Sequence, residues 1–287
     1  MSALLLDDAR PVTARRRASA PLTVILCAVI VAAVLLCAAA HAWLNPLAMD
    51  QDTALGSVGP GVWGHALGTD QLGRDVLALL GAGSLTAVVG PLVVAAGSML
   101  LGLVLGGWAG YRGGFADGLV SRYADLVLAL PAILLAIVVA GLLGGGYWVT
   151  VLVLVVVFSP SDIRLVRGAV MEQMTRPYIE SARVLGLSGP RILFRHVIPN
   201  VLPVMLANAL LNISFALVAI SSLSFLGIGA PAGSADWGLQ LADGRVLLGT
   251  NPLASIAPGL AIVAMATSVN LLGHWFAERF EKKAVAR

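Results

Sequence analysis

Several stretches of this chain contain no Asp, Glu, Lys or Arg, and each is long enough to cross a lipid bilayer. A helix needs about 20 apolar residues to span the hydrocarbon core. The charge-free stretches are Ala18–Met49, Val76–Tyr111, Leu126–Ser161, Val197–Ala235 and Val246–Ala277. Charged residues make up only 11% of the chain, against roughly 25% in soluble domains. We therefore expect an integral membrane protein.

The third stretch is too long for one helix and is interrupted by Gly144, Gly145 and Gly146, so we interpret it as a helical hairpin. The sequence then predicts an all-α membrane protein with transmembrane helices near 22–44, 85–110, 126–143, 147–166, 202–225 and 253–276. We expect no ionisable side chain to be buried within these helices. Residues 1–20 form a polar tail, and residues 21–287 form a single transmembrane domain.

The basic residues predict the orientation. With the N-terminus in the cytoplasm, every Lys and Arg except Arg74 and Arg245 falls in a cytoplasmic segment, as the positive-inside rule requires. Both termini and a loop at 167–200 are then cytoplasmic, and a loop at 45–84 lies outside. The net charge of +3 follows from this orientation, so we infer no nucleic-acid partner.

The first helix follows three arginines and ends in alanines, which is also a feature of signal peptides. The run from Leu22 to Ala40 exceeds the 7–15 residues of a signal h-region, so we favour a retained membrane anchor. Cys27 and Cys37 lie too far apart on this helix to form a disulfide with each other, and we interpret them as packing residues.

The sequence lacks the motifs that a transporter would need in order to work without partner subunits. The only lysines, Lys282 and Lys283, do not follow a glycine as a P-loop requires, so we expect no ATP site. The four histidines are scattered, and we expect no metal site, no bound cofactor and no catalytic residues. Without ionisable residues in the spans, an ion-coupled transporter is disfavoured. We expect a non-catalytic pathway whose energy comes from another subunit.

Two groups of residues in the spans leave alternatives open. Asn208 and Asn212 share a helix face and, with Asn270, either line a polar conduit or form interhelical hydrogen bonds. Gly102, Gly106 and Gly110 form a face of small residues that suits close helix packing, either within the chain or against another subunit.

The charged segment between the fourth and fifth helices has the pattern of a helix–turn–helix outside the bilayer. Pro177 suits a helix start, Tyr178–Leu185 would form the first helix, and Gly186 would end it. Pro190 would start a second helix that Pro199 stops. Val184, Leu185 and Leu187 could enter a groove on a partner, with Glu180, Arg183 and Arg191 at its rim. The alternative, a basic loop on lipid headgroups, does not explain the Gly and Pro positions.

On the outer side, Asp70 is placed to cap a short helix over Gln71–Leu80. We expect its apolar side to lie on the membrane surface.

The residues of the charged segment carry a family resemblance. Glu180-Ser181-Ala182, Gly186 and Val197-Ile198-Pro199 resemble the E-A-A-x3-G…L-P loop of importer permeases of the ATP-binding cassette (ABC) class, with Ser181 in place of alanine. The outer run from His65 to Asp75, containing Leu67-Gly68-Thr69-Asp70 and Gly73-Arg74-Asp75, resembles the signature of the C-type permeases of dipeptide, oligopeptide and nickel importers. Further matches are Ser224–Gly229, Trp237-Gly238, Pro258–Ala261 and Asn270–Gly273, after which His274 replaces a common aspartate.

This resemblance implies a type I ABC importer permease fold in a bacterial cytoplasmic (inner) membrane. The implied partners are a second related permease, two P-loop ATPase subunits that bind ATP and Mg, an extracytoplasmic binding protein and membrane lipid. Residues implied to couple to the ATPase are Tyr178, Glu180, Ser181, Ala182, Arg183, Leu185, Gly186 and Leu187. Asp70, Arg74 and Asp75 are implied to contact the binding protein.

The implied function is the permease subunit of a peptide importer, forming half of the pathway. Nickel chelates or glutathione-like peptides are alternative substrates in the same family. A secondary transporter or channel, and a membrane anchor or assembly protein, are the competing classes of function.

Overall fold

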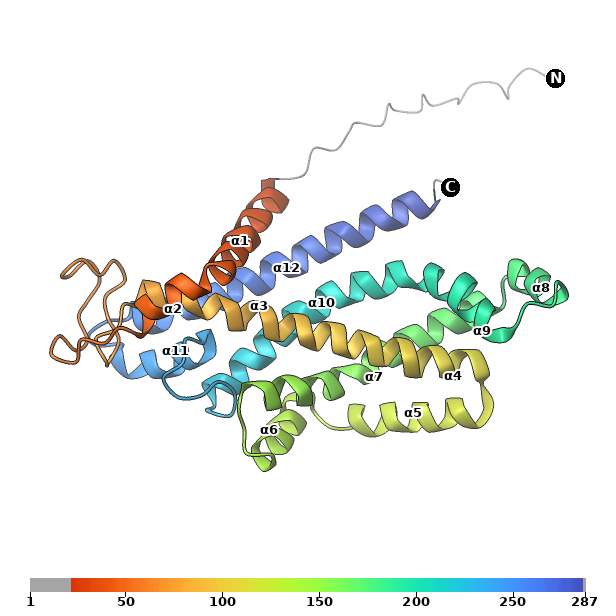
Figure 1. The fold of residues 1–287 in the computed structure, drawn as a ribbon, viewed down its shortest axis with the longest axis horizontal. Coiled ribbons are helices and arrows are strands. Elements are labelled where there is room, and N and C mark those ends of the chain that lie inside the picture. Colours follow the sequence, from red (N-terminus) through yellow and green to blue (C-terminus); the bar gives the residue numbers. More distant parts are fainter. Residues whose placement is uncertain (1–21, 286–287) are drawn as a thin grey trace, which may run out of the picture.

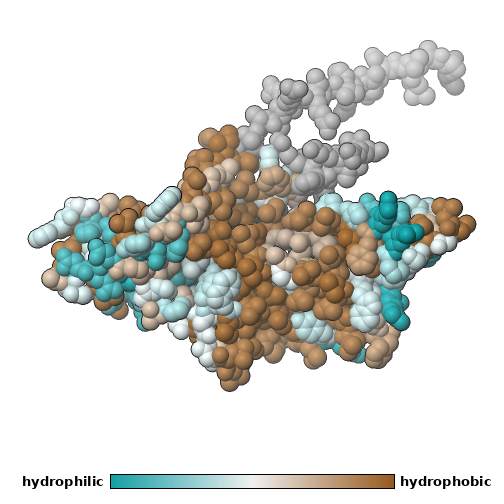
Figure 2. Space-filling view, viewed as in Figure 1, coloured by the Kyte–Doolittle hydropathy of each residue, from teal (hydrophilic) through white to brown (hydrophobic). Residues whose placement is uncertain are grey.

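A computed structural model describes residues 22–285, with side chains to Glu278, and in this part of the chain the protein is helical with no strand. The predicted N-terminal tail and the C-terminal residues Ala286 and Arg287 lie outside the described residues. The long helices lie roughly side by side along the long axis of the molecule (Figure 1). On the face that Figure 2 shows, a broad hydrophobic belt crosses the middle of the molecule, and polar residues gather at both ends. This distribution fits a bilayer-spanning bundle.

The N-terminal half begins with α1 (Leu22–Ala39) and α2 (His41–Met49), followed by a loop over residues 50–75. The first long span consists of α3 (Val76–Leu101), a π-helical turn η1 (Gly102–Gly106) and α4 (Gly107–Arg112). Two shorter helices follow, α5 (Gly114–Leu128) and α6 (Ala132–Leu142). They bend by 90° at the break before Pro131, so the predicted single helix over 126–143 is wrong. Proline disfavours the α conformation in the residue that precedes it.

The C-terminal half contains α7 (Tyr147–Met174), α8 (Pro177–Val184), α9 (Gly189–Ile192), a second π-helical turn η2 (Leu193–Val197) and α10 (Ile198–Phe225). A short helix, α11 (Trp237–Gly244), a 3-10 turn η3 (Arg245–Leu247) and α12 (Leu253–Val285) complete the described chain. Among the described residues, five helical segments are long and apolar enough to cross a membrane, or six if the bent pair is one span. The predicted number of spans agrees with the higher figure.

The core lies where α3, α6, α7 and α10 meet, around Val94, Leu154, Ala216 and Leu223. A second cluster joins α7 and α10 to the loop between them, and a third joins α1, α3, α10, α11 and α12. The glycine face predicted from sequence packs within the chain. A side chain at Gly102, Gly106 or Gly110 would meet α7 at Asp162, Ile163 or Arg167, respectively. Close approach of the two backbones is what small residues permit in membrane helices.

Candidate functional site

The loop between α7 and α10, residues 175–197, carries two short helices at one end of the molecule, opposite the 50–75 loop (Figure 1). Pro177 occupies the first turn of α8, where a missing N–H costs nothing. Leu185 caps the helix, and Gly186 then takes a φ of 75°, which favours glycine. The predicted first helix and its glycine end are therefore confirmed.

One face of α8 is buried and its tip is not. Ile179 and Ala182 pack into a cluster with residues of α7, α9 and α10. Val184 and Leu185 are 88% and 80% exposed, and hydrophobic residues are visible at the end of the molecule where Figure 1 places α8 (Figure 2). Glu180, Ser181 and Arg183 are exposed around them. An apolar tip with a charged rim outside the hydrophobic belt is typical of a contact site for a soluble protein.

Tyr178 joins α8 to the helices on either side of the loop. Its hydroxyl donates to the side-chain carbonyl of Gln173 in α7 at 2.7 Å and accepts from the amide of Asn200 in α10 at 3.3 Å. On α9, Gly189 lies so close to the hydroxyl of Tyr111 that a side chain there would clash. These contacts fix the loop to α4, α7 and α10.

Two details of the predicted loop differ from the structure. Leu187 is half-buried against the cluster around Ile179 rather than free at the tip. Pro199 does not end the second helix, because the backbone continues from α9 through η2 into α10. The residue four before Pro199 is Arg195, which lies in η2; the wider π turn displaces the carbonyl that a proline ring would otherwise meet.

The 50–75 loop contains the sequence run His65–Asp75, and most of its polar side chains bond within the loop or to neighbouring helices. Thr69 accepts from Val58 N–H at 2.9 Å and donates to the carbonyl of Gly56 at 2.7 Å. The Asp75 carboxylate lies 2.7 Å from Nδ1 of His65 and caps α3 through Ala78 N–H. The predicted helix over Gln71–Leu80 is therefore wrong: Asp75 starts the helix, and residues 71–75 form a turn with Gly73 at φ 74°.

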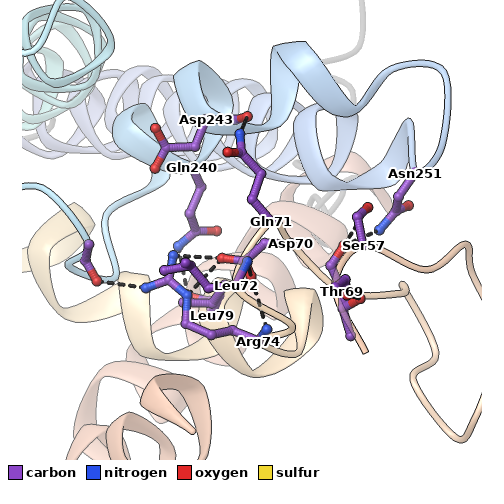
Figure 3. A network of polar contacts seen from close by, with 12 residues as sticks. Ser57, Thr69, Asp70, Gln71, Leu72, Arg74, Leu79, Gln240, Asp243 and Asn251 are labelled. Carbon is purple, nitrogen blue, oxygen red and sulfur yellow. Dashed lines mark hydrogen bonds and ion pairs between the residues drawn. The ribbon is translucent and has the colours of Figure 1, made fainter. Parts of the chain in front are cut away.

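Asp70 and Arg74 point toward one another beside Gln240 and Asp243 of α11 (Figure 3). Arg74 is only 4% exposed and donates to Asp70 and to the carbonyl of Gly233 at 2.7 Å. Burial raises the pKa of the nearby Asp243, and the positive charge of Arg74 opposes this shift. Three residues were expected to contact a binding protein. Arg74 is buried and stabilises the loop through its hydrogen bonds, whereas Asp70 and Asp75 are only partly exposed.

Sequence reasoning missed one ionisable residue within a span. Asp162 lies in α7 and is 3% exposed, so the expectation of spans without buried charges is wrong. Asn208 donates to its Oδ1 at 2.6 Å, and Asn212 donates to Oδ1 at 2.9 Å and to Oδ2 at 3.1 Å. The predicted shared face of the two asparagines is confirmed, and α7 is the helix that it meets. Asp162 directly follows the charge-free stretch that ends at Ser161. This position next to an apolar stretch is the sequence feature that could have indicated its burial.

Asn208 also lines a pocket of about 200 Å³ between α7, α10 and α12. Its other lining residues are mostly apolar, with His274 of α12 among them. Asn270, the third predicted pathway residue, is half-buried on α12 and is not among the described lining residues. The Asp162 hydrogen bonds thus lie beside a pocket that opens between the long helices.

The chain is similar in sequence to a known protein family and to individual members of known transport systems. Residues 102–285 match the family model described as binding-protein-dependent transport system inner membrane component. The chain is 37% identical over 222 residues to the glutathione transport system permease protein GsiD of Pectobacterium atrosepticum, covering 76% of this chain and 73% of that protein. It is 32% identical over 267 residues to the probable D,D-dipeptide transport system permease protein DdpC of Escherichia coli, covering 92% of this chain and 88% of that protein.

A solved structure supports the same fold. A chain of the MetNI methionine ABC transporter, in a structure of its inward-facing conformations, superposes with a TM-score of 0.56 at 18% identity. The match covers 71% of this chain and 96% of that one. The all-helical permease fold of a type I ABC importer is therefore confirmed for this chain.

Proposed function

The chain belongs to the family of binding-protein-dependent transport system inner membrane components, and we propose that it is the permease subunit of an ATP-driven peptide importer. Relatives named for dipeptide, di/tripeptide and glutathione transport support peptides as the substrate class. Nickel chelates remain an alternative within the resemblance, and glutathione-like peptides are favoured over them by the name of the GsiD relative.

The α8 tip is the proposed contact with a P-loop ATPase. Val184 and Leu185 would enter a hydrophobic groove, and Glu180 and Arg183 would fix the register at its rim. The observation that carries the proposal is this exposed apolar tip on a helix fixed to α7 and α10 by Tyr178. ATP and Mg would be bound by that partner, and this chain would be non-catalytic.

The proposed orientation puts α8 in the cytoplasm and the 50–75 loop outside. Arg176, Arg183, Arg191 and Arg195 at the α8 end support it through the positive-inside rule. Both chain termini would then be cytoplasmic.

The 50–75 loop is the proposed contact with an extracytoplasmic binding protein. Asp70, Arg74 and Asp75 would hold the loop in shape, since their side chains bond internally. Exposed apolar side chains such as Trp63, which is 82% exposed, would supply the contact itself.

The pathway would form between this chain and a second related permease. Asn208, with the pocket it lines between α7, α10 and α12, is the proposed pathway-facing region of this half. Asn212 and Asn270 stand on the same two helices, α10 and α12.

The proposal is tested by purifying the tagged chain with its native neighbours from mild detergent and measuring ATPase activity. We expect a second permease and P-loop ATPases to co-purify, with activity stimulated by a peptide-loaded binding protein. A chain that purifies alone and moves solute into liposomes without ATP would instead be a secondary transporter or channel.

A further inference from the structure

Asp162 is a carboxylate in the middle of a membrane span without a cationic partner. Among the described side chains, no Lys, Arg or His forms an ion pair with it. Other acids on this side of the bundle do have such partners: Asp117 pairs with Arg167, and Asp125 pairs with Arg164. An ionisable residue in a bilayer is costly, and its presence calls for a partner or a role.

Asp162 accepts hydrogen bonds from two amides of α10, and its side chain also hydrogen-bonds Ser98 of α3. Asn208 and Asn212 stand one helical turn apart and donate to the same carboxylate, which thereby accepts three hydrogen bonds. Hydrogen bonds to a charged acceptor are short and strong, and a surrounding of low dielectric strengthens them further. The three bonds form a clamp between α7 and α10, here called the Asp162 clamp.

The opposite side of Asp162 is also fixed. Its Cβ lies where a side chain on Gly102 would be, so α7 packs directly against the backbone of η1. The α7 helix is therefore held between the α3–η1 span on one side and α10 on the other. A carboxylate in this position has little room to turn toward a solute.

The location of the clamp along the helices connects it to α8. α7 and α10 are the two helices that flank the 175–197 loop. Asp162 lies 12 residues before the end of α7, about 18 Å along a helix, and Asn208 lies 10 residues into α10, about 15 Å. Between the clamp and α8, Val166, Val170, Val201 and Met205 pack with Ile179 of α8 in one buried cluster.

We propose that the Asp162 clamp makes α7, α8, α9 and α10 a single rigid unit, so that displacement of α8 by the ATPase moves both long helices together. Asp162 is then a positioning residue: it acts through Asn208 and Asn212 and touches no transported solute. This inference rests on the proposed function of α8 as the ATPase contact. A clamp of directional polar bonds suits this role because apolar packing between helices in lipid has no hydrophobic driving force to restore it.

A competing role for Asp162 is direct binding of a cationic solute. Both carboxylate oxygens are already engaged, and the side chain is almost completely enclosed. Asn208 lines the neighbouring pocket, whereas Asp162 is not among its lining residues. Solute recognition would change the apparent KM for uptake, whereas loss of positioning changes the uptake obtained per ATP hydrolysed.

The test uses the complete transporter with its native partners in proteoliposomes, measuring uptake and ATP hydrolysis in the same preparation. We expect Asp162→Ala, and separately the double variant Asn208→Ala/Asn212→Ala, to lower uptake per ATP by at least about fivefold. The apparent KM of Asp162→Ala should stay unchanged. Combining all three substitutions should add no further loss, since all remove the same clamp. Ser214→Ala is the matched control, because Ser214 is also buried on α10 and its hydroxyl has no partner among the described residues.

A second experiment asks whether a covalent link between α7 and α10 can replace the clamp. Asp162→Cys and Asn212→Cys are introduced into a chain that also carries Cys27→Ala and Cys37→Ala, and the two new thiols are joined by a short bifunctional crosslinker. We expect the crosslinked chain to recover the uptake per ATP of the wild type, since a rigid unit tolerates a covalent link. Loss of transport on crosslinking would overturn the proposal, because α7 and α10 would then have to move apart.

Unchanged uptake per ATP in Asp162→Ala, or a changed KM alone, would also overturn the proposal. A wild-type complex without ATP-driven uptake would refute the proposed function rather than the clamp.

Discussion

The guanidinium of Arg74 lies 2.6 Å from the carboxylate of Asp70, and both side chains are largely enclosed by the 50–75 loop and α11. Arg74 also donates to the carbonyl of Gly233, which is 159 residues away in the sequence, and so connects the loop to the segment before α11. The sequence run that contains these residues resembles a family signature, and the structure gives it a physical reason: it is the framework that shapes the loop.

Replacing Arg74 by alanine should therefore destabilise the protein. It leaves the Asp70 carboxylate enclosed without its partner, and breaking a buried pair in this way costs about 3–5 kcal/mol. The measurement is the temperature at which the detergent-solubilised protein loses its monodisperse peak in size-exclusion chromatography. Arg183→Ala is the control, because Arg183 is exposed on α8 and should leave this temperature unchanged. Equal stability of the two variants would show that the Arg74 bonds contribute little.

Gly186→Pro and Glu180→Lys should uncouple transport without preventing membrane insertion. Proline requires φ near −65°, whereas Gly186 has a φ of 75°, so the substitution redirects the chain after α8. Glu180→Lys reverses a charge at the rim of the apolar tip. Gly186→Ala should have a smaller effect, since alanine tolerates this φ at a cost of about 1–2 kcal/mol. The checks are uptake and the amount of protein in the membrane; normal uptake in both severe variants would contradict the role of α8.

Gly102→Leu and Gly106→Leu should each destabilise the bundle, because the added side chain would meet the backbone of α7 at Asp162 or Ile163. Overpacking of this kind costs about 1–3 kcal/mol or more. Gly107 is the matched control: it lies next to Gly106, and a Cβ placed there meets nothing within 4 Å. Thermal unfolding of the three variants should separate Gly107→Leu from the other two, and a similar loss in all three would refute the packing argument.

Asp236 predicts a pH dependence of stability. Burial raises the pKa of this carboxyl, although main-chain N–H groups of Leu239 and Gly238 favour its charged form. The folded protein thus binds the proton more tightly than the unfolded chain, and the contribution of Asp236 becomes more favourable as the pH falls toward its folded pKa. Asp236→Asn keeps the cap of α11 without the charge. The variant should gain stability over the wild type at about pH 8, and this gain should shrink toward about pH 5.

The positions of the long helices could be predicted because bilayer thickness imposes a run of apolar residues on each span. The α8 helix was predictable for a different reason: Pro177 and Gly186 mark its two ends through local backbone preferences. The start of α3 at Asp75 was not, since Asp70 and Asp75 are equally suitable caps in sequence. Only the contacts of Asp70 with Arg74 assign it to the turn.

The burial of Asp162 was not predicted from the sequence. A single acid next to Arg164 at the end of an apolar stretch resembles the edge of a span, and its burial depends on how far α7 continues toward Met174. The partners Asn208 and Asn212 come from more than 40 residues away. Such a pairing is set by the packing of α7 on α10, which no local pattern encodes.

The proposed function depends most on α8 being the surface that meets the ATPase. Its direct test is a single cysteine at Val184, in a chain with Cys27 and Cys37 replaced by alanine, carrying a short crosslinker in the assembled complex. Trp63→Cys is the control, since Trp63 is similarly exposed on the opposite 50–75 loop. We predict that position 184 captures a P-loop ATPase and that position 63 does not. Capture of the ATPase from position 63 alone, in a complex that remains intact, would contradict both the docking site and the orientation.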